Sequence, residues 1–410
     1  MKLLVIVARG LSVLPLGPYG NRWIDTPTLD ALAASGVVFD WHFADHPDPA
    51  GARRAWRTGR YRLPRADGTL PAGDGPDLPA ALRQAGVVTR LIHDTTHPLP
   101  AEFPGGWDRT EGIAASANTS LLEAALNAAE SALNDLRDTP NWLLWLDLAS
   151  LLPPWRVPAD FLDPYFAPPQ PEEDEEDEDE DEEEEERLED EEEEEPLEPL
   201  LDPGSGAIDR EDDELYLRIQ TTFAAAVSYL DVALGELLQI LRDQPGEEPV
   251  LLVTSDRGQA LGERSVVGTG ALHEEIVHLP LILYGVGGEG RRVAALTQAV
   301  DLAPTMAELF GVPWPATDGR SLLPLARGES VPWREEALCG QVTERGVEWG
   351  LRTAEWFFRL TMMPEGPKAA LFVKPDDRLE VNDVVQQHLE PAEELERRLR
   401  ERVGLREMPP

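Results

Sequence analysis

Short, continuously apolar runs constrain the fold of this chain more than any other feature. Four of them, Leu3–Ala8, Trp142–Leu148, Val250–Thr254 and Pro280–Tyr284, lack the alternation of polar and apolar residues that marks a half-exposed strand. Strands of this kind are buried on both faces, as in parallel sheets covered by helices on each side. The runs therefore predict strands at the centre of such a sheet.

Helical periodicity lies between these runs. The clearest case is Leu215–Leu241, where apolar residues recur at steps of three and four. Shorter helical patterns cover Thr28–Ala34, Leu78–Ala85 and Ala303–Phe310, and Asp301 stands where it could cap the last of these. Strands that alternate with helices predict an α/β protein with a doubly wound, mainly parallel sheet.

The pattern changes after about residue 329. Four short strand-like runs follow one another, and a charged helical segment, Pro391–Arg402, comes after them. We therefore predict two domains, an α/β domain over residues 1–328 and a smaller α+β domain with an antiparallel sheet over residues 329–410. The four runs are Ala337–Val342, Trp349–Arg352, Trp356–Thr361 and Ala369–Val373.

One segment dominates the charge of the chain. Between Glu172 and Glu195 there are 22 acidic residues and one basic residue, which together supply half of the formal net charge of −42. Like charges this dense resist collapse, so residues 168–206 are predicted to form a disordered acidic insertion. The insertion is either a solvated surface segment or a tail that docks a basic protein partner or buffers cations. A chain this acidic is not expected to bind nucleic acid.

Cysteine content and hydropathy bear on the compartment. The single cysteine, Cys339, excludes an intramolecular disulfide and suits a reducing environment. The apolar start resembles a short signal peptide, but Arg9 follows it without a small-residue cleavage pattern, so a buried strand is the preferred interpretation. Since no run approaches the roughly 20 apolar residues that cross a bilayer, we expect a cytoplasmic protein with no membrane span.

Several segments, in order along the chain, resemble the sulfatase family of the alkaline phosphatase superfamily. RRAWRTGRY (residues 53–61) resembles the end of the family signature C/S-x-P-S-R-x-x-x-x-T-G-R, and VTSDRGQALGER (253–264) resembles its later strand and metal loop. The resemblance implies an alkaline-phosphatase-like fold with a smaller C-terminal domain. Further matching segments are LLVIVARGL (3–11), the stretch 17–44, LHEEIVHLPLILYGVG (272–287), VDLAPTMAELFGV (300–312), DGRSLLPLARGE (318–329) and FVKPDDRLEVNDV (372–384).

The resemblance also implies a chemistry, whose nucleophile this sequence lacks. In the family a cysteine or serine is converted to formylglycine, and the hydrate of that group attacks sulfur. Counting back from the T-G-R at residues 58–60, this position falls on Pro49, which has no group to convert. Residues 46–60 contain no cysteine or serine, and only the signature arginine persists, as Arg53.

The metal ligands that the resemblance implies are also mostly absent. The family holds a divalent cation, usually calcium, with carboxylates from two strand ends, because hard cations take oxygen ligands. The two aspartates after the first strand correspond to Arg9 and Gly10, and the later pair reads Asp256-Arg257. One carboxylate beside guanidinium groups does not make a calcium site, so no cofactor is expected.

The remaining catalytic positions of the family show the same loss. Its lysine falls on Thr269 and one of its histidines on Leu152, while either His93 or His97 is a remnant of another. Lysine and histidine neutralise the sulfate and protonate the leaving oxygen in the family. These losses together predict a sulfatase-fold pseudoenzyme with a structural, regulatory or anion-binding role.

Two interpretations of the arginines stay open at this point. Arg9, Arg53 and Arg257, with Asp256 and His97, could bind an anionic small molecule such as a sulfate or phosphate ester, because arginine suits oxyanions. Alternatively the charges pair with one another, with Arg9 or Arg257 donating hydrogen bonds to Asp256, and plug the old metal site. A third alternative is a residual sulfate- or phosphate-ester hydrolase acting through a non-standard site.

The acidic run leads to a testable prediction. Deleting Glu172–Glu195 should leave the melting temperature unchanged or raise it, because electrostatic self-repulsion falls. Differential scanning calorimetry of the full chain and the deletion variant measures this. A large drop in melting temperature would mean that the run packs against the body of the protein.

Overall fold

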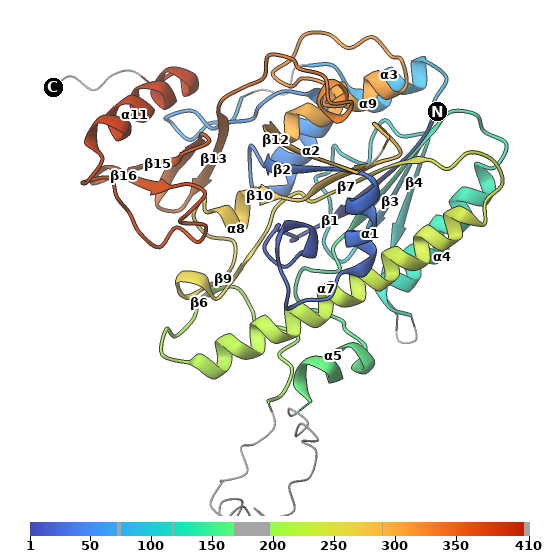
Figure 1. Cartoon of the computed structure of the whole chain (residues 1–410), viewed down its shortest axis with the longest axis horizontal. Helices are drawn as coiled ribbons and strands as arrows, with labels where there is room; N and C mark the ends of the chain where they lie inside the picture. The colour runs from blue at the N-terminus through green and yellow to red at the C-terminus, as the bar shows by residue number, and fades with distance from the viewer. Residues whose placement is uncertain (72–74, 117–118, 168–196, 289, 406–410) are drawn as a thin grey trace, which may run out of the picture.

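The computed structural model describes residues 1–71, 75–116, 119–167, 197–288 and 290–405. Its main feature is a nine-stranded sheet with helices on both faces (Figure 1). In spatial order the strands are β10 (His278–Leu279), β2 (Val37–Phe43), β11 (Leu281–Tyr284), β7 (Val250–Thr254), β1 (Lys2–Ala8), β5 (Trp142–Leu148), β3 (Val88–Asp94) and β4 (Arg109–Ile113), with β12 (Arg291–Gln298) beside β2.

The centre of the sheet is parallel, as the apolar runs predicted. β1 lies between β5 and β7 and is parallel to both, with Val7 opposite both Asp147 and Thr254. The expectation that Leu3–Ala8 and Val250–Thr254 are neighbouring central strands is therefore confirmed. The run at Pro280–Tyr284 forms β11, which is antiparallel to β7 and β2. Continuous apolar character indicates that a strand is buried on both faces, but it does not determine whether the strand runs parallel or antiparallel to its neighbours.

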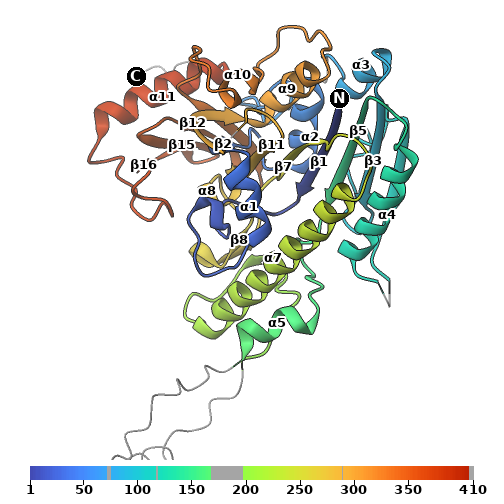
Figure 2. The same ribbon diagram turned by 45° about the vertical axis from the view of Figure 1, so that its right-hand side comes forward.

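The two faces of the sheet carry two separate cores. Along β1, Leu4 and Ile6 point to the face covered by α1, α4 and α7, while Leu3 and Val5 point to the face covered by α2, α3 and α9 (Figure 2). This alternation is the period-two pattern of a strand, buried on each side. The helices are α1 (Pro27–Ser35), α2 (Pro49–Thr58), α3 (Leu78–Gln84), α4 (Leu121–Asp135), α5 (Ala159–Phe166), α7 (Asp213–Arg242), α8 (Glu274–Val277), α9 (Leu302–Leu309) and α10 (Leu323–Ala326), with short 3-10 turns η1 (Gly17–Tyr19), η2 (Glu263–Ser265) and η3 (Ala299–Asp301).

The long helix α7 spans one face of the sheet. Its apolar stripe, which includes Phe223, Leu230 and Leu237, is buried in the core. By length and composition α7 is the one helix within the described ranges that could cross a membrane, and 56% of its most apolar window is buried inside the protein. A core helix of a globular domain passes the same test.

The predicted role of Asp301 differs from the observed one. It occupies the N-cap position of α9, but its side chain makes no capping hydrogen bond there. Instead its carboxylate accepts hydrogen bonds from the backbone N–H groups of Gln298 and Arg320 and forms an ion pair with Arg334. The carboxylate thus joins η3 to the segment that leads into the small sheet.

The C-terminal part forms the expected antiparallel sheet. One of its faces packs on the terminal helix α11 (Leu389–Val403), with Leu395 and Leu399 buried against it, and the other faces the main sheet. The domain boundary at residue 329 stays a prediction. The strands are β13 (Ala337–Thr343), β14 (Gly346–Arg352), β15 (Trp356–Met363) and β16 (Gly366–Val373), and a third, small sheet contains β6 (Gly206–Ala207), β9 (Val266–Gly268) and β8 (Ala260–Leu261).

The predicted acidic insertion lies mainly outside the described residues. The run Glu172–Glu195 belongs to the part that the structure does not describe. Residues 197–206 are described, and two of them bond to the core: the Leu201 carbonyl accepts from the N–H of Trp155 at 2.7 Å, and the N–H of Leu200 donates to Thr222 on α7 at 2.9 Å. The expectation of a disordered insertion over residues 168–206 stays a prediction.

Candidate functional site

The candidate site lies where the carboxyl ends of β1, β5 and β7 meet. Arg9 directly follows β1, Asp147 is the last but one residue of β5, and Asp256 stands two residues beyond β7. Because these strands are parallel neighbours, their ends lie at the same edge of the sheet, where open α/β sheets place ligand sites. Arg9, Asp147 and Asp256 are all buried.

Helix α2 brings a fourth charged group to this edge. Asp48 caps the helix by accepting from the N–H groups of Ala50 and Gly51, and Pro49 takes the first helical position, where its missing N–H costs nothing. Arg53 then lies one turn into the helix and is 1% exposed. The position expected for a nucleophile is thus a helix-starting proline.

Arg53 joins the two carboxylates. Its Nη2 donates to both oxygens of Asp147, at 2.6 and 2.8 Å, and its Nη1 donates to Asp256 Oδ2 at 2.9 Å. Such charge-assisted hydrogen bonds are the strong ones, and the bidentate pair fixes orientation as well. The guanidinium group therefore links strand β5, the β7 loop and helix α2.

Arg9 lies against the same carboxylates without hydrogen-bonding to them. Its Nε is 3.4 Å from Asp256 Oδ2 and 3.8 Å from Asp147 Oδ1, and its Nη1 donates to the backbone carbonyl of His97 at 2.6 Å. We call Arg9, Arg53, Asp147 and Asp256 the Arg53 charge cluster. The sequence suggested Arg9 or Arg257 as the hydrogen-bond donor to Asp256, and the donor is Arg53 instead.

The structure places His97 at the margin of the Arg53 charge cluster. Only the backbone carbonyl of His97 touches Arg9, while its Nε2 lies 3.1 Å from the Pro153 carbonyl and its Nδ1 lies 3.6 Å from Asp94. His93 bonds to the Asp94 carbonyl and has no recorded contact with the cluster in the part of the chain described. Of the two candidate histidines, His97 is the one near the site.

Arg257 adds a third positive charge near two carboxylates. Within the described residues its guanidinium makes no hydrogen bond or ion pair, and its Nε is buried without a partner. Burial lowers the pKa of Arg257, against the opposing attraction of Asp256. Burial alone would raise the pKa of Asp256, but Arg53, Arg9 and Arg257 hold it below its ordinary value.

The residues at this edge do not fit a calcium ion. The two carboxylates that could be ligands, Asp147 and Asp256, already accept hydrogen bonds from Arg53, so a guanidinium occupies the place between them. Elsewhere in the described ranges no group of three or more histidine, cysteine or acidic residues is arranged to hold a metal. Calcium sites need six to eight oxygen ligands, so no step of a metal-dependent reaction can be built here.

The position after Arg9 is occupied by a glycine, Gly10, in a conformation that strains other residues. Its φ of +87° lies in the left-handed region, and a Cβ there would come within 2.8 Å of Leu152 Cδ2 and 3.2 Å of Gln259 Nε2. Gln259 itself donates to the carbonyls of Gly10 and Leu151 and thereby ties the three strand ends together. The backbone conformation at this edge therefore favours glycine at position 10.

Asp147, which accepts the bidentate bond from Arg53, was not among the site residues predicted from the sequence. A signal was available, because Asp147 is the single charged residue in the run Trp142–Leu148 and stands near its carboxyl end. A charge in a fully buried strand needs a partner. Gln259 gave no such signal, because only the folded backbone places carbonyl groups around it.

A cavity of about 210 Å³ opens beside helix α2. Arg53 is the one member of the Arg53 charge cluster among its lining residues, which also include Arg54, Arg57 and Arg62. The Nε of Arg57 donates a hydrogen bond to Asp77 Oδ1 at 2.5 Å, so Asp77 neutralises this arginine. The cavity is therefore rich in guanidinium groups in a chain with a formal net charge of −42.

Comparison with known proteins points to one family. The family model described as Sulfatase matches residues 133–312. The multifunctional alkaline phosphatase superfamily protein PehA of Trinickia caryophylli is 32% identical over 140 residues, which cover 32% of this chain and 27% of that protein. Iduronate 2-sulfatase of Homo sapiens is 25% identical over 378 residues, covering 73% of this chain and 67% of that protein. The matches thus span between about a quarter and two thirds of these relatives.

Solved structures agree in fold over nearly the whole chain. The phosphonate monoester hydrolase of Agrobacterium radiobacter superimposes with a TM-score of 0.76 and 20% identity, covering 98% of this chain and 96% of that one. BT4656, solved in complex with its substrate D-glucosamine-2-N,6-O-disulfate, gives a TM-score of 0.73 at 18% identity, covering 98% and 97%. These likenesses establish the shared α/β architecture with its C-terminal antiparallel sheet.

The Arg53 charge cluster generates a stability prediction. Asp256→Ala should reduce the free energy of unfolding by about 3–5 kcal/mol, because it leaves a buried guanidinium group without one of its partners. Asp256→Asn should cost less, since one oxygen acceptor remains. Urea denaturation measures both, with Asp138→Ala as the control, because Asp138 is exposed and makes no recorded bond among the described residues.

The pH dependence follows from the lowered pKa of Asp256. Its stabilising contribution should be complete above the unfolded value of about 3.9 and be lost as the pH falls through the lower folded value. The difference in stability between the wild type and Asp256→Asn should therefore shrink in acid. A loss of stability for Asp256→Ala no larger than that for Asp138→Ala would contradict a buried, coupled cluster.

Proposed function

Since this chain is a member of the sulfatase family of the alkaline phosphatase superfamily, we propose that it is a catalytically inactive member. Its role is structural, regulatory or anion-binding, and its own side chains fill the place of the metal. The observation that carries the proposal is the Arg53 guanidinium group, which hydrogen-bonds to both Asp147 and Asp256. A cation and this guanidinium cannot occupy the same place between the carboxylates.

The helix that should present the nucleophile supports the proposal. Pro49 begins α2, and the Gly51 backbone packs against His46 so closely that a Cβ would come within 2.6 Å of the His46 side chain. The family signature has proline at the position of Gly51, which this packing does not accommodate. The loss of the nucleophile is thus accompanied by local repacking of the loop.

Catalytic activity gives the direct test. The purified full chain, produced with a formylglycine-generating enzyme, should hydrolyse aryl sulfates no faster than buffer, with or without calcium. Pro49→Cys should not restore turnover, because the carboxylates remain bound to Arg53. An active sulfatase matured in the same way is the positive control. Robust turnover by the unmodified chain would overturn the proposal and favour a hydrolase with a non-standard site.

Calcium binding gives a second test that does not depend on a substrate. Millimolar calcium should leave the melting temperature unchanged, and so should a chelator, because a ligand stabilises only a fold that binds it. Differential scanning calorimetry with magnesium as the matched control ion measures this. A rise of several degrees with calcium that the chelator reverses would establish a retained metal site.

Anion binding is the second candidate function, and the arginine-lined cavity beside α2 favours it. Arg62 lines this cavity, and its Nε is buried without a partner in the described part of the chain. A sulfate or phosphate ester would supply the oxygen acceptors that this group lacks. Calorimetric titration with sulfate and phosphate tests the idea: Arg62→Gln should weaken binding, whereas Arg22→Gln, at an exposed site elsewhere, should not.

A further inference from the structure

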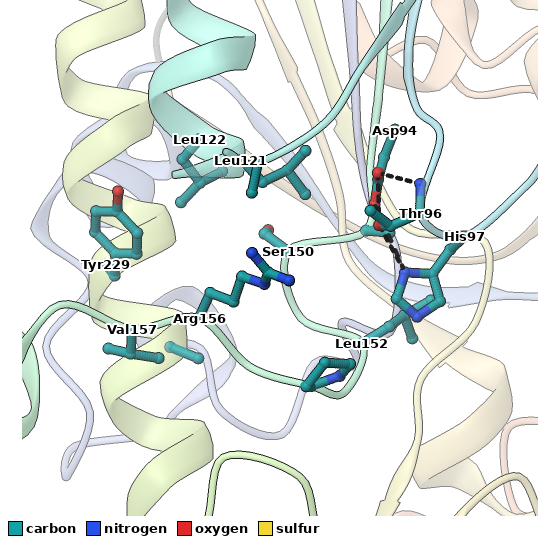
Figure 3. A pocket seen from close by; sticks show the side chains of 14 residues that line it. Asp94, Thr96, His97, Leu121, Leu122, Ser150, Leu152, Arg156, Val157 and Tyr229 are labelled. Carbon is teal, nitrogen blue, oxygen red and sulfur yellow. Dashed lines mark hydrogen bonds and ion pairs between the residues drawn. The ribbon is translucent and has the colours of Figure 1, made fainter. Parts of the chain in front are cut away.

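A second cavity of about 160 Å³ lies on the other side of His97, outside the Arg53 charge cluster. It is enclosed by the segments that follow β3 and β5, by the first turn of α4 and by the middle of α7 (Figure 3). Its position between the two loops and the two helices separates it from the cavity beside α2, whose lining residues are all different.

One wall of this cavity is polar and already satisfied. The buried carboxylate of Asp94 accepts hydrogen bonds from the backbone N–H and the hydroxyl of Thr96, at 2.8 and 2.7 Å. The His97 ring lies between Asp94 and the Pro153 carbonyl. This wall therefore needs no cation from solution, and its negative charge disfavours a ligand with two negative charges.

The opposite side of the cavity offers donors without acceptors. Figure 3 shows the Arg156 side chain pointing into the cavity, and among the described residues it has no hydrogen bond or ion pair. Ser150 also lines the cavity, and its Oγ is buried with no partner in the same set of residues. Arg156 is exposed to solvent, so its guanidinium group is hydrated and free to pair with an anion that enters the cavity.

The rest of the lining is apolar. Leu121 and Leu122 of α4 and Val157 of the loop after β5 contribute aliphatic surface. Tyr229 of α7 contributes its ring, because its hydroxyl is already engaged with Ser120 Oγ at 2.6 Å. A ligand that fills this cavity must therefore combine a compact apolar body with one acceptor group.

We propose that this cavity binds a small monocarboxylic acid with a compact aromatic or branched aliphatic body. The planar carboxylate matches the fork of the Arg156 guanidinium, and the Ser150 hydroxyl adds one more donor. The size fits, because an apolar cavity of about 150 Å³ is known to hold benzene. Arg156 is the one arginine or lysine among the described lining residues, and Asp94 lies nearby, so the cavity favours a monoanion over a phosphate or other dianion.

Such a ligand would sit next to the Arg53 charge cluster without being part of it. His97 lines the cavity with its side chain and accepts a hydrogen bond from Arg9 with its backbone carbonyl. Occupation of the cavity would hold the segment after β3 in place and so support that contact. The inference goes beyond the inactive role proposed above, and it stands whether or not the chain hydrolyses esters.

Benzoate is the probe, measured by isothermal titration calorimetry on the full chain. Benzamide has the same shape without the charge and should bind at least about tenfold more weakly, because hydrogen bonds to charged groups are the stronger ones. Arg156→Gln should weaken benzoate binding to a similar extent. Arg22→Gln, at an exposed arginine outside the cavity, is the matched control and should leave binding unchanged.

A second variant keeps the test independent of Arg156. Ala115→Leu adds volume at the partly exposed edge of the cavity and should abolish benzoate binding without unfolding the protein, as circular dichroism will show. Absence of benzoate binding at millimolar concentration, equal binding of benzamide, or binding that survives both variants would each overturn the inference. Tighter binding of phenyl phosphate than of benzoate would overturn the choice of a monocarboxylate.

Discussion

The bonds that Arg53 makes to two buried aspartates are the interaction on which this end of the fold depends. Asp147 belongs to the central strand β5, and Asp256 lies in the loop after β7, on the other side of β1. Neither carboxylate could stay ionised in the core without a partner. The guanidinium group supplies that partner from a helix on one face of the sheet. A buried pair adds little net stability by itself, but removing one member is costly, so the three elements are held in one arrangement.

The backbone at this edge of the sheet also restricts which residues can occupy it. Gly10 adopts a left-handed conformation against Leu152, and Gly258 lies so close to the next segment that a Cβ would be 1.9 Å from the Glu275 carbonyl oxygen. Gln259 then bonds to carbonyls from two other loops. The loops pack on one another directly, and the described residues form no ring of free oxygen ligands at the strand ends.

Buried pairs of opposite charges also occur where the small C-terminal sheet meets the main sheet. Glu274 of α8 accepts from Arg352 Nε of β14 at 2.9 Å and lies 3.3 Å from Lys374 Nζ, which also pairs with Glu380 at 3.1 Å. All these groups are buried. Both places combine opposite charges from distant parts of the sequence, so the relative position of the elements is fixed by charge pairing as well as by apolar packing.

The buried central strands, the long helix and the antiparallel C-terminal sheet could be predicted from the sequence, because each is a local pattern of residue types. The sequence also predicted that Arg9, Arg53 and Asp256 lie close together, because family motifs mark the ends of neighbouring strands. The place of Asp147 in the cluster and the role of Arg53 as the donor to Asp256 could be seen only in the folded protein. The direction of β11 and the cavity at Arg156 were likewise decided there. Pairing between charges about a hundred or more residues apart depends on angstrom-scale distances between elements, and no local pattern of residues carries that information.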